Sequence, residues 1–303
     1  MGRELQLSKQ AFDQARHGIF QYGRKLEQLR FNHHFVEPMP EQVAAELATF
    51  QNPDGGFGHG IEPDFWLPDS SPMATTVGLQ IAVELDLEAS HPIVGAAMDY
   101  LLSTYDTELG GWIPTPLTVN NYPHAPWWHR DPNGSLDTSS LRINPGAEIV
   151  GYLLRWGHDD GQQWVQDLFK SIGTLESHEV LCCLRLLDTP GLLETDREAL
   201  FEHVSRAMQS AIETNPDKWG GYCVKPLTAI AHPDARFARE FAHALDQQLD
   251  YEIAHQSQQL GVWLPHWSWG DFYPEAWQEA RLAWSGIITL ELLRSLQSFG
   301  RLQ

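Results

Sequence analysis

The chain has 303 residues, and its 40 acidic and 20 basic side chains give it a formal net charge of −20 at pH 7. This excess of acid argues against a nucleic-acid partner, because neutralising phosphates requires clustered Lys and Arg, and it argues against anionic membrane surfaces as well. The sequence contains no apolar run of about 18 residues and no visible signal peptide, so we expect a cytoplasmic protein without a membrane span.

Apolar residues at helical spacing predict about ten helices and almost no strand. No linker or charge block divides the chain, so a single domain over residues 1–303 is expected. Its three cysteines, Cys182, Cys183 and Cys223, are interpreted as reduced thiols and not as a disulfide framework. The expected helices cover residues 8–30, 40–51, 73–87, 92–105, 144–156, 161–172, 176–188, 194–214, 235–256 and 276–298.

A glycine-rich loop separates the helices expected at 40–51 and 73–87. It reads Gln51-Asn52-Pro53-Asp54-Gly55-Gly56-Phe57-Gly58-His59-Gly60. Pro53 cannot continue a helix, and paired glycines allow positive φ angles or a close approach of other backbone. The next helix is predicted to start at Ser70-Ser71-Pro72, with a serine cap and proline in the first turn. We therefore expect a shaped loop between two helices.

The order of helix, polar turn, glycine and aromatic residue recurs along the chain. It is found again at Gly110-Gly111-Trp112, Gly220-Gly221-Tyr222 and Gly261-Val262-Trp263. Repetition of one helix-and-turn unit along the chain indicates stacked helical hairpins. Periodicity alone does not distinguish a closed ring of hairpins from an open solenoid. With Gln51 at a helix end before Asp-Gly-Gly-Phe, the pattern resembles the repeats of the terpenoid cyclase and protein prenyltransferase β-subunit superfamily. The resemblance implies an all-α protein, an α/α toroid with an aromatic-lined central pocket.

The catalytic motifs of that superfamily are missing from the chain. Class II cyclases carry Asp-x-Asp-Asp, to which Glu62-Pro63-Asp64 and Asp159-Asp160 are the nearest approximations. Prenyltransferases carry an Asp-x-Cys zinc pair, whereas Asp217 lies six residues before Cys223. The histidines show no strong metal spacing, and no nucleotide-binding fingerprint is present. We therefore expect neither a metal nor another cofactor.

Acids and aromatic residues within the loops supply the candidate site. Glu62 and Asp64 flank a proline in a rigid segment, and a carboxylic acid kept protonated by apolar surroundings can donate a proton to an alkene or epoxide. Asp271 is the candidate for a further carboxylate, beside two loop tryptophans. The expected substrate-binding residues are Phe57, His59, Trp66, Asn120, Tyr122, His124, Trp127, Trp128, Trp267 and Trp269.

Three functions agree with this pattern. The first is a cyclase-like or prenyltransferase-like enzyme that acts on an apolar, isoprenoid small molecule by acid-initiated chemistry, with ring faces stabilising positive charge. The second is a carbohydrate-active enzyme with paired carboxylates in an α/α barrel. The third is a non-catalytic protein that binds a small ligand on the same fold. The oligomeric state is left open.

Overall fold

The computed structural model describes residues 5–134, 138–158 and 161–303, and for residues 138–140 it describes only the backbone. Within these ranges every regular element is an α-helix or a 3₁₀-helix, and extended segments meet only in isolated β-bridges. The prediction of an all-α protein is therefore confirmed. No helix in the described part of the chain is long and apolar enough to cross a bilayer.

The chain divides into two compact units. Unit 1 comprises Met1–Glu46 and Ile212–Gln303, and unit 2 comprises Leu47–Ala211. Unit 2 is thus continuous in sequence, whereas unit 1 is assembled from both ends of the chain. The single domain over residues 1–303 stays a prediction.

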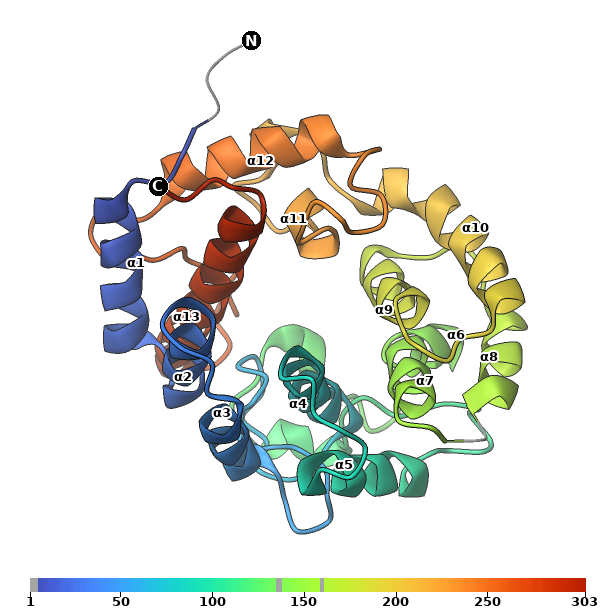
Figure 1. The fold of residues 1–303 in the computed structure, drawn as a ribbon. Coiled ribbons are helices and arrows are strands. Elements are labelled where there is room, and N and C mark those ends of the chain that lie inside the picture. The colour runs from blue at the N-terminus through green and yellow to red at the C-terminus, as the bar shows by residue number, and fades with distance from the viewer. Residues whose placement is uncertain (1–4, 135–137, 159–160) are drawn as a thin grey trace. The chain divides into compact units, whose positions relative to one another are not determined.

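In unit 1 the long helix α13 packs against both α1 and α2, and α12 packs against α11 (Figure 1). Helix α12 also packs against the short helix η4. The two ends of the chain meet here, because Leu7 forms a parallel bridge with Leu302. The buried guanidinium of Arg301 reinforces this junction by donating to the Leu5 carbonyl over 2.8 Å and to Asp250 over 2.7 Å. The helices of unit 1 are α1 (Lys9–Tyr22), α2 (Lys25–Phe35), α3 (Pro40–Leu47, whose last residue begins unit 2), η4 (Pro216–Lys218), α11 (Pro226–Ala229), α12 (Ala242–His255) and α13 (Pro274–Ser298).

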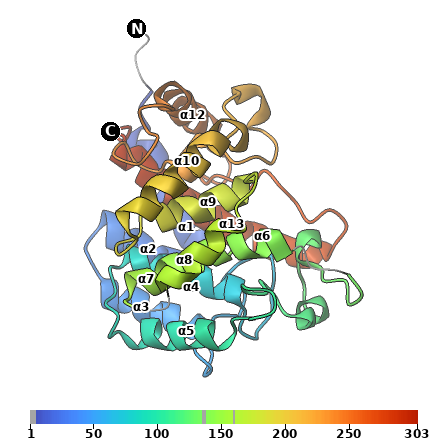
Figure 2. The same cartoon turned by 90° about the vertical axis from the view of Figure 1, so that its right-hand side faces the viewer.

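In unit 2 the longer helices pack on one another in a continuous series: α5 on α4, α4 on α7, α7 on α8 and α9, and α9 on α10. Figure 2 shows the part of this series from α7 to α10 side by side. The helices of unit 2 are η1 (Ala48–Phe50), α4 (Pro72–Glu84), α5 (Pro92–Ser103), η2 (Leu117–Asn121), η3 (Pro126–Trp128), α6 (Thr138–Ile143), α7 (Gly146–Arg155), α8 (Gly161–Phe169), α9 (Ser177–Leu187) and α10 (Glu194–Ala211).

Local signals set several helix starts. Ser71 caps α4 by accepting the amide of Ala74 over 3.1 Å, and Pro72 occupies the first turn, as the sequence predicts. In α9, the side chains of Glu176 and Glu179 form a reciprocal capping box. These caps satisfy amide groups that have no partner inside the helix.

The helix expected over residues 8–30 is wrong as a single element, because α1 ends at Tyr22 and α2 begins at Lys25. Gly23 is extended at the break. A Cβ added to Gly286 in α13 would lie 2.8 Å from the Cα of Gly23, so two backbones approach closely at the break. The stretch 113–143, which lies between two of the expected helices, contains η2, η3 and α6 in its described parts.

The glycine loop docks onto a neighbouring helix through backbone contact. Gly55 has φ +91°, and a Cβ there would lie 2.1 Å from the carbonyl oxygen of Ala96 in α5. The Gln51 amide donates over 2.9 Å to the Gly55 carbonyl and over 2.9 Å to the Ile93 carbonyl. One glutamine therefore closes the turn and ties it to α5.

Unit 1 contains the same arrangement. The Gln256 amide donates over 2.6 Å to the Gly261 carbonyl and over 2.9 Å to the Ala11 carbonyl of α1. Gly261 has φ +72°, and a Cβ there would lie 2.6 Å from the Gln14 carbonyl oxygen. The two turns, far apart in sequence, thus use the same chemistry.

Buried tryptophans complete three of the turns by hydrogen-bonding carbonyls in or just after the preceding helix. The indole N–H of Trp112 donates to the Leu101 carbonyl over 2.7 Å, and that of Trp263 donates to the Glu252 carbonyl over 2.8 Å. Trp219 donates to the Glu213 carbonyl over 2.7 Å. Each indole satisfies an acceptor and fills the core beside the turn.

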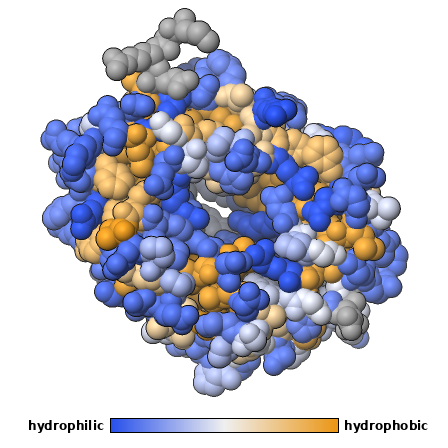
Figure 3. Space-filling model, viewed as in Figure 1, coloured by the Kyte–Doolittle hydropathy of each residue, from blue (hydrophilic) through white to orange (hydrophobic). Residues whose placement is uncertain are grey.

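Hydrophilic residues cover most of the face shown in Figure 3, and hydrophobic residues appear there in small patches. This distribution agrees with the excess of acidic side chains. The core is formed by fully buried aliphatic and aromatic side chains such as Phe31, Leu47, Phe57 and Trp219.

We predict that Gly55→Ala destabilises the protein by about 1–3 kcal/mol, because a methyl group collides with backbone at a positive φ angle. Gly95→Ala is the matched control, since Gly95 lies within α5 and a Cβ there meets nothing within 4 Å. The control is expected to be neutral or to stabilise by up to about 1 kcal/mol. Urea midpoints measure both changes, and equal midpoints for the two variants would contradict the docking role of Gly55.

Candidate functional site

The structure brings two of the predicted site segments together in unit 2. Phe65 and His124 form an antiparallel bridge. The Trp66 amide donates to the Pro123 carbonyl over 2.9 Å, and the Ala125 amide donates to the Asp64 carbonyl over 2.7 Å. The segment after the glycine loop is therefore fixed to the segment around His124. We call residues 61–66 and 122–129 together the loop junction.

Both predicted acids of the loop junction are nearly buried. Asp64 is 4% exposed and Glu62 is 9% exposed. A Glu62 carboxylate oxygen accepts the amide N–H of Asp64, so this carboxylate is oriented by its own segment. Burial disfavours the charged form of a carboxyl group, and a hydrogen bond donated to the carboxylate favours it.

A histidine pair leads from the buried side of the junction to its surface. The Nδ1 atom of His124 lies 2.6 Å from the Tyr122 carbonyl oxygen, and since a carbonyl only accepts, Nδ1 carries the proton. The Nε2 atom of a neutral His124 therefore accepts from His129 Nδ1 over 3.1 Å. His124 is buried and His129 is exposed, with the rings stacked 5.4 Å apart. The pair thus connects a buried imidazole to an exposed one.

The loop junction itself contains several aromatic rings. Phe65 is buried and meets Trp128 edge to face, with ring centroids 5.1 Å apart. The Trp128 indole nitrogen is buried and has no hydrogen-bond partner. Trp66 is half-buried and donates its indole N–H to the Pro63 carbonyl over 3.2 Å, whereas Trp127 is 51% exposed. Such ring faces stabilise a cation or stack on the apolar face of a ligand.

Other predicted binding residues hold the loops in place. Phe57 has no exposed surface, and its ring packs against Gly78, where a Cβ would lie 2.8 Å from three ring atoms. His59 has φ +55°, and its Nε2 lies 2.9 Å from the Asn52 side-chain oxygen. Asn120 exchanges two hydrogen bonds with the Arg130 backbone, of 2.6 and 2.9 Å. Tyr122 is half-buried.

The remaining predicted site residues belong to unit 1. Asp271 is exposed. Trp269 is fully buried and packs against Trp277, with ring centroids 5.7 Å apart. Trp267 is half-buried, and its ring meets that of Trp284 in α13 edge to face at 5.1 Å. These side chains are thus part of a different unit from the loop junction.

Sequence reasoning missed a carboxylate at the centre of three helices of unit 2. Glu148 in α7 is 3% exposed. One of its oxygens accepts from Gln80 in α4 over 2.8 Å and from the Tyr152 hydroxyl over 2.5 Å. The other accepts from Arg185 in α9 over 3.0 Å and from the Cys182 thiol over 3.7 Å. The signal in the sequence is a single acid within the apolar run Gly146-Ala147-Glu148-Ile149-Val150.

Glu148 connects helices α4, α7 and α9 through hydrogen bonds and an ion pair. Burial, followed by the negative charge of Glu148, raises the pKa of Tyr152 and that of Cys182 well above their ordinary values. Both groups therefore remain protonated donors at neutral pH, and the Cys182 thiol is not activated as a nucleophile. Cys182 and Cys183 are buried free thiols, as expected, and Cys223 is a half-buried free thiol.

Glu148→Gln is predicted to lower the free energy of unfolding by about 1–3 kcal/mol, because two buried donors and an arginine lose their charged acceptor. Chemical denaturation checks this value, with Glu88→Gln at an exposed position as the control. A variant as stable as the wild type would show that Glu148 does not link the helices.

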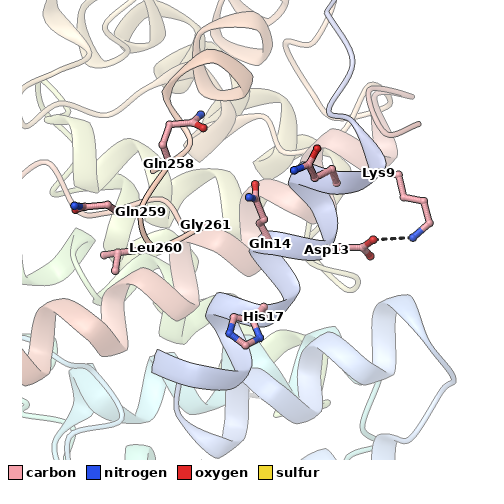
Figure 4. Close-up of a pocket in the computed structure, with 9 residues that line it drawn as sticks. Lys9, Asp13, Gln14, His17, Gln258, Gln259, Leu260 and Gly261 are labelled. Atoms are coloured by element: carbon pink, nitrogen blue, oxygen red, sulfur yellow. Dashed lines mark hydrogen bonds and ion pairs between the residues drawn. The ribbon is translucent and has the colours of Figure 1, made fainter.

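A surface hollow in unit 1 has a volume of about 610 Å³. Figure 4 shows α1 on one side, with Lys9, Asp13, Gln14 and His17, and the segment 258–261 on the other. The charged side chains here are exposed, and Lys9 pairs with Asp13 over 2.7 Å. Because no buried titratable group faces the hollow, we assign it no reaction.

No group of three or more His, Cys, Asp or Glu side chains within the described ranges is arranged to hold a metal ion. Comparisons with models of protein families, with curated proteins and with solved structures gave no match.

Proposed function

We propose that the loop junction of unit 2 is the active site of an enzyme that rearranges an apolar, isoprenoid small molecule by acid-initiated chemistry. The observation that carries the proposal is the attachment of the buried acids Glu62 and Asp64 to the segment of the buried His124, which is hydrogen-bonded to the exposed His129. In this proposal one of the buried acids donates the proton, and the histidine pair carries its replacement from solvent.

In the proposed reaction, the carboxyl group of Asp64 or Glu62 transfers its proton to an alkene carbon, and the π electrons form the new C–H bond. The resulting carbocation is stabilised by the faces of Phe65, Trp66 and Trp128 while a second alkene attacks it. Loss of a proton from carbon ends the sequence, so substrate and product are isomers. The histidine pair then returns a proton to the carboxylate.

The same proposal includes the finer features that the resemblance implies. The hairpins would close into an α/α toroid, and the loop junction would line an aromatic pocket at its centre. A cytoplasmic protein that acts on a small molecule, without nucleic acid and without a cofactor, agrees with the net charge of −20 and with the lack of a metal-ligand pattern in the sequence.

A carbohydrate-active enzyme is the second candidate, and the exposed ring of Trp127 favours it, because sugars stack on tryptophan. Glycoside hydrolysis requires two carboxyl groups about 5–10 Å apart that face each other across the substrate. Glu62 and Asp64 belong to one short segment, and Glu62 accepts the Asp64 amide. We therefore place isoprenoid chemistry first.

Asp64→Asn is expected to abolish turnover without unfolding the protein, because the amide keeps the volume but has no acidic proton. The assay incubates the protein with squalene, 2,3-oxidosqualene or geranylgeraniol and searches for cyclic isomers by gas chromatography and mass spectrometry. Glu62→Gln is the matched variant that identifies the acting acid. A lowered melting temperature with unchanged activity would refute the catalytic role of Asp64. Asp64 would then be a structural residue, and its replacement would lower the free energy of unfolding by about 1–3 kcal/mol.

His129→Ala is expected to slow repeated turnover while leaving the first turnover intact, since only the return of the proton passes through this side chain. A decrease of about 10²-fold or more in the steady-state rate is typical of a lost proton-transfer group. Single-turnover and steady-state measurements on the same preparation separate the two phases. Equal losses in both phases would contradict the relay.

A further inference from the structure

The hollow of unit 1 lies between two walls that are joined to each other. One wall is α1, and the other is the turn of residues 258–261 (Figure 4). The Gln256 amide donates to the Ala11 carbonyl of α1 over 2.9 Å. Gly261 comes so close to α1 that a Cβ there would lie 2.6 Å from the Gln14 carbonyl oxygen. Because these contacts fix the walls, the hollow is formed without a ligand.

The turn is braced at its base, whereas its tip has unused backbone donors. The Ser257 amide donates to the Val262 carbonyl over 3.1 Å, and the Gly261 amide donates to the Ser257 carbonyl over 2.8 Å. The backbone N–H groups of Gln258 and Gln259 donate to no residue in the described part of the chain. The turn therefore offers these two groups to solvent or to a ligand.

Four glutamine side chains line the hollow, and none of them hydrogen-bonds to another described residue. They are Gln10 and Gln14 of α1 and Gln258 and Gln259 of the turn, and all four are exposed. Each side-chain amide offers two N–H donors and one carbonyl acceptor. The hollow thus presents neutral groups that both donate and accept hydrogen bonds.

The other lining residues exclude several classes of ligand. Lys9 and Asp13 neutralise each other over 2.7 Å, and the net charge of −20 repels anions such as phosphates. Among the described residues that line the hollow there is no Phe, Tyr or Trp, on which a sugar ring would stack. An apolar ligand would leave the amides without hydrogen bonds. A neutral or basic ligand with many hydrogen-bonding groups agrees with this lining.

The spacing of the glutamines matches an extended peptide. Gln10 and Gln14 are one helical turn apart, which is about 6 Å along the axis of α1. In an extended peptide, the backbone groups on one side recur at every second residue, about 6.7 Å apart. Each amide can therefore donate to one peptide carbonyl and accept from one peptide N–H, as main-chain recognition requires.

We propose that the hollow between α1 and the turn of residues 258–261 binds an extended peptide segment that is neutral or basic. Gln10 and Gln14 hydrogen-bond one side of the peptide backbone, and Gln258 and Gln259 hydrogen-bond the other. The peptide is bound and not cleaved, since no buried titratable group faces the hollow. This site is independent of the reaction proposed for unit 2.

Selection of peptides on the full chain tests the site. A phage-displayed library of random heptapeptides is selected on the immobilised protein, and enriched sequences are synthesised with a fluorescent label for anisotropy measurements. At least one peptide is expected to bind in solution with a Kd of about 0.1 mM or lower. The enriched peptides are expected to have a net charge of zero or above, because the protein is strongly acidic.

Replacing Gln10 and Gln14 together by alanine is expected to weaken binding by about tenfold or more, because the hydrogen bonds to one side of the peptide are lost. Alanine keeps the Cβ atom and favours the helix, and thermal melts check that the fold is retained. Gln42→Ala removes an exposed amide of α3 outside the hollow and should bind like the wild type. Replacing Gln258 and Gln259 by alanine tests the opposite wall without changing α1.

Methylation of the peptide backbone separates main-chain recognition from side-chain recognition. Two versions of a selected peptide carry N-methyl groups on alternate residues, one on the odd and one on the even positions. One version is expected to bind about tenfold more weakly than the other, because only one set of N–H groups faces Gln10 and Gln14.

Three results would overturn the proposal. They are the lack of any enriched peptide that binds in solution, binding that both alanine pairs leave unchanged, and equal affinity of the two methylated peptides. Failure of the isoprenoid assay does not affect these results, since the two sites belong to different units.

Discussion

The docking of glycine turns onto neighbouring helices is the constraint on which both units depend. At Gly55 and at Gly261 the chain has a positive φ angle and touches the backbone of another helix, and at each turn one glutamine donates both to the turn and to that helix. A side chain at either glycine would push the two elements apart. The close packing of these turns on α5 in unit 2 and on α1 in unit 1 therefore requires a residue without a Cβ atom.

These turns also determine the positions of acidic side chains. The glycine loop ends with the rigid segment that carries Glu62 and Asp64, and its docking holds these acids against the segment of His124. In unit 1, the Trp263 indole donates to the backbone carbonyl of the buried Glu252, so a turn fixes the position of this acid in α12. In each unit, the elements that give the fold its stability also orient a buried acid.

The helices were largely predictable from sequence, because apolar periodicity, serine caps and prolines are local signals. The break at Gly23 was not, since the backbone found against it, that of Gly286, is more than two hundred residues away in the sequence. The proximity of the segments around Asp64 and His124 agrees with their joint assignment to one site. Glu148 and Glu252 were missed because their ion-pair partners, Arg185 and Lys225, belong to other helices or turns. The sequence also does not distinguish an aromatic side chain that is buried in the core, such as Phe57 or Trp269, from one that is exposed, such as Trp127.

The way in which the chain is divided between its units has a consequence for the order of folding during synthesis. Unit 2 is continuous, so all of its residues have left the ribosome before most of the second part of unit 1 is made. Helices α1 and α2 precede unit 2 in the chain, but they pack against α13, which follows unit 2. The apolar faces that they bury on α13 therefore stay without this partner until α13 has been synthesised. Loss of α13 thus exposes apolar surface on helices that are made much earlier.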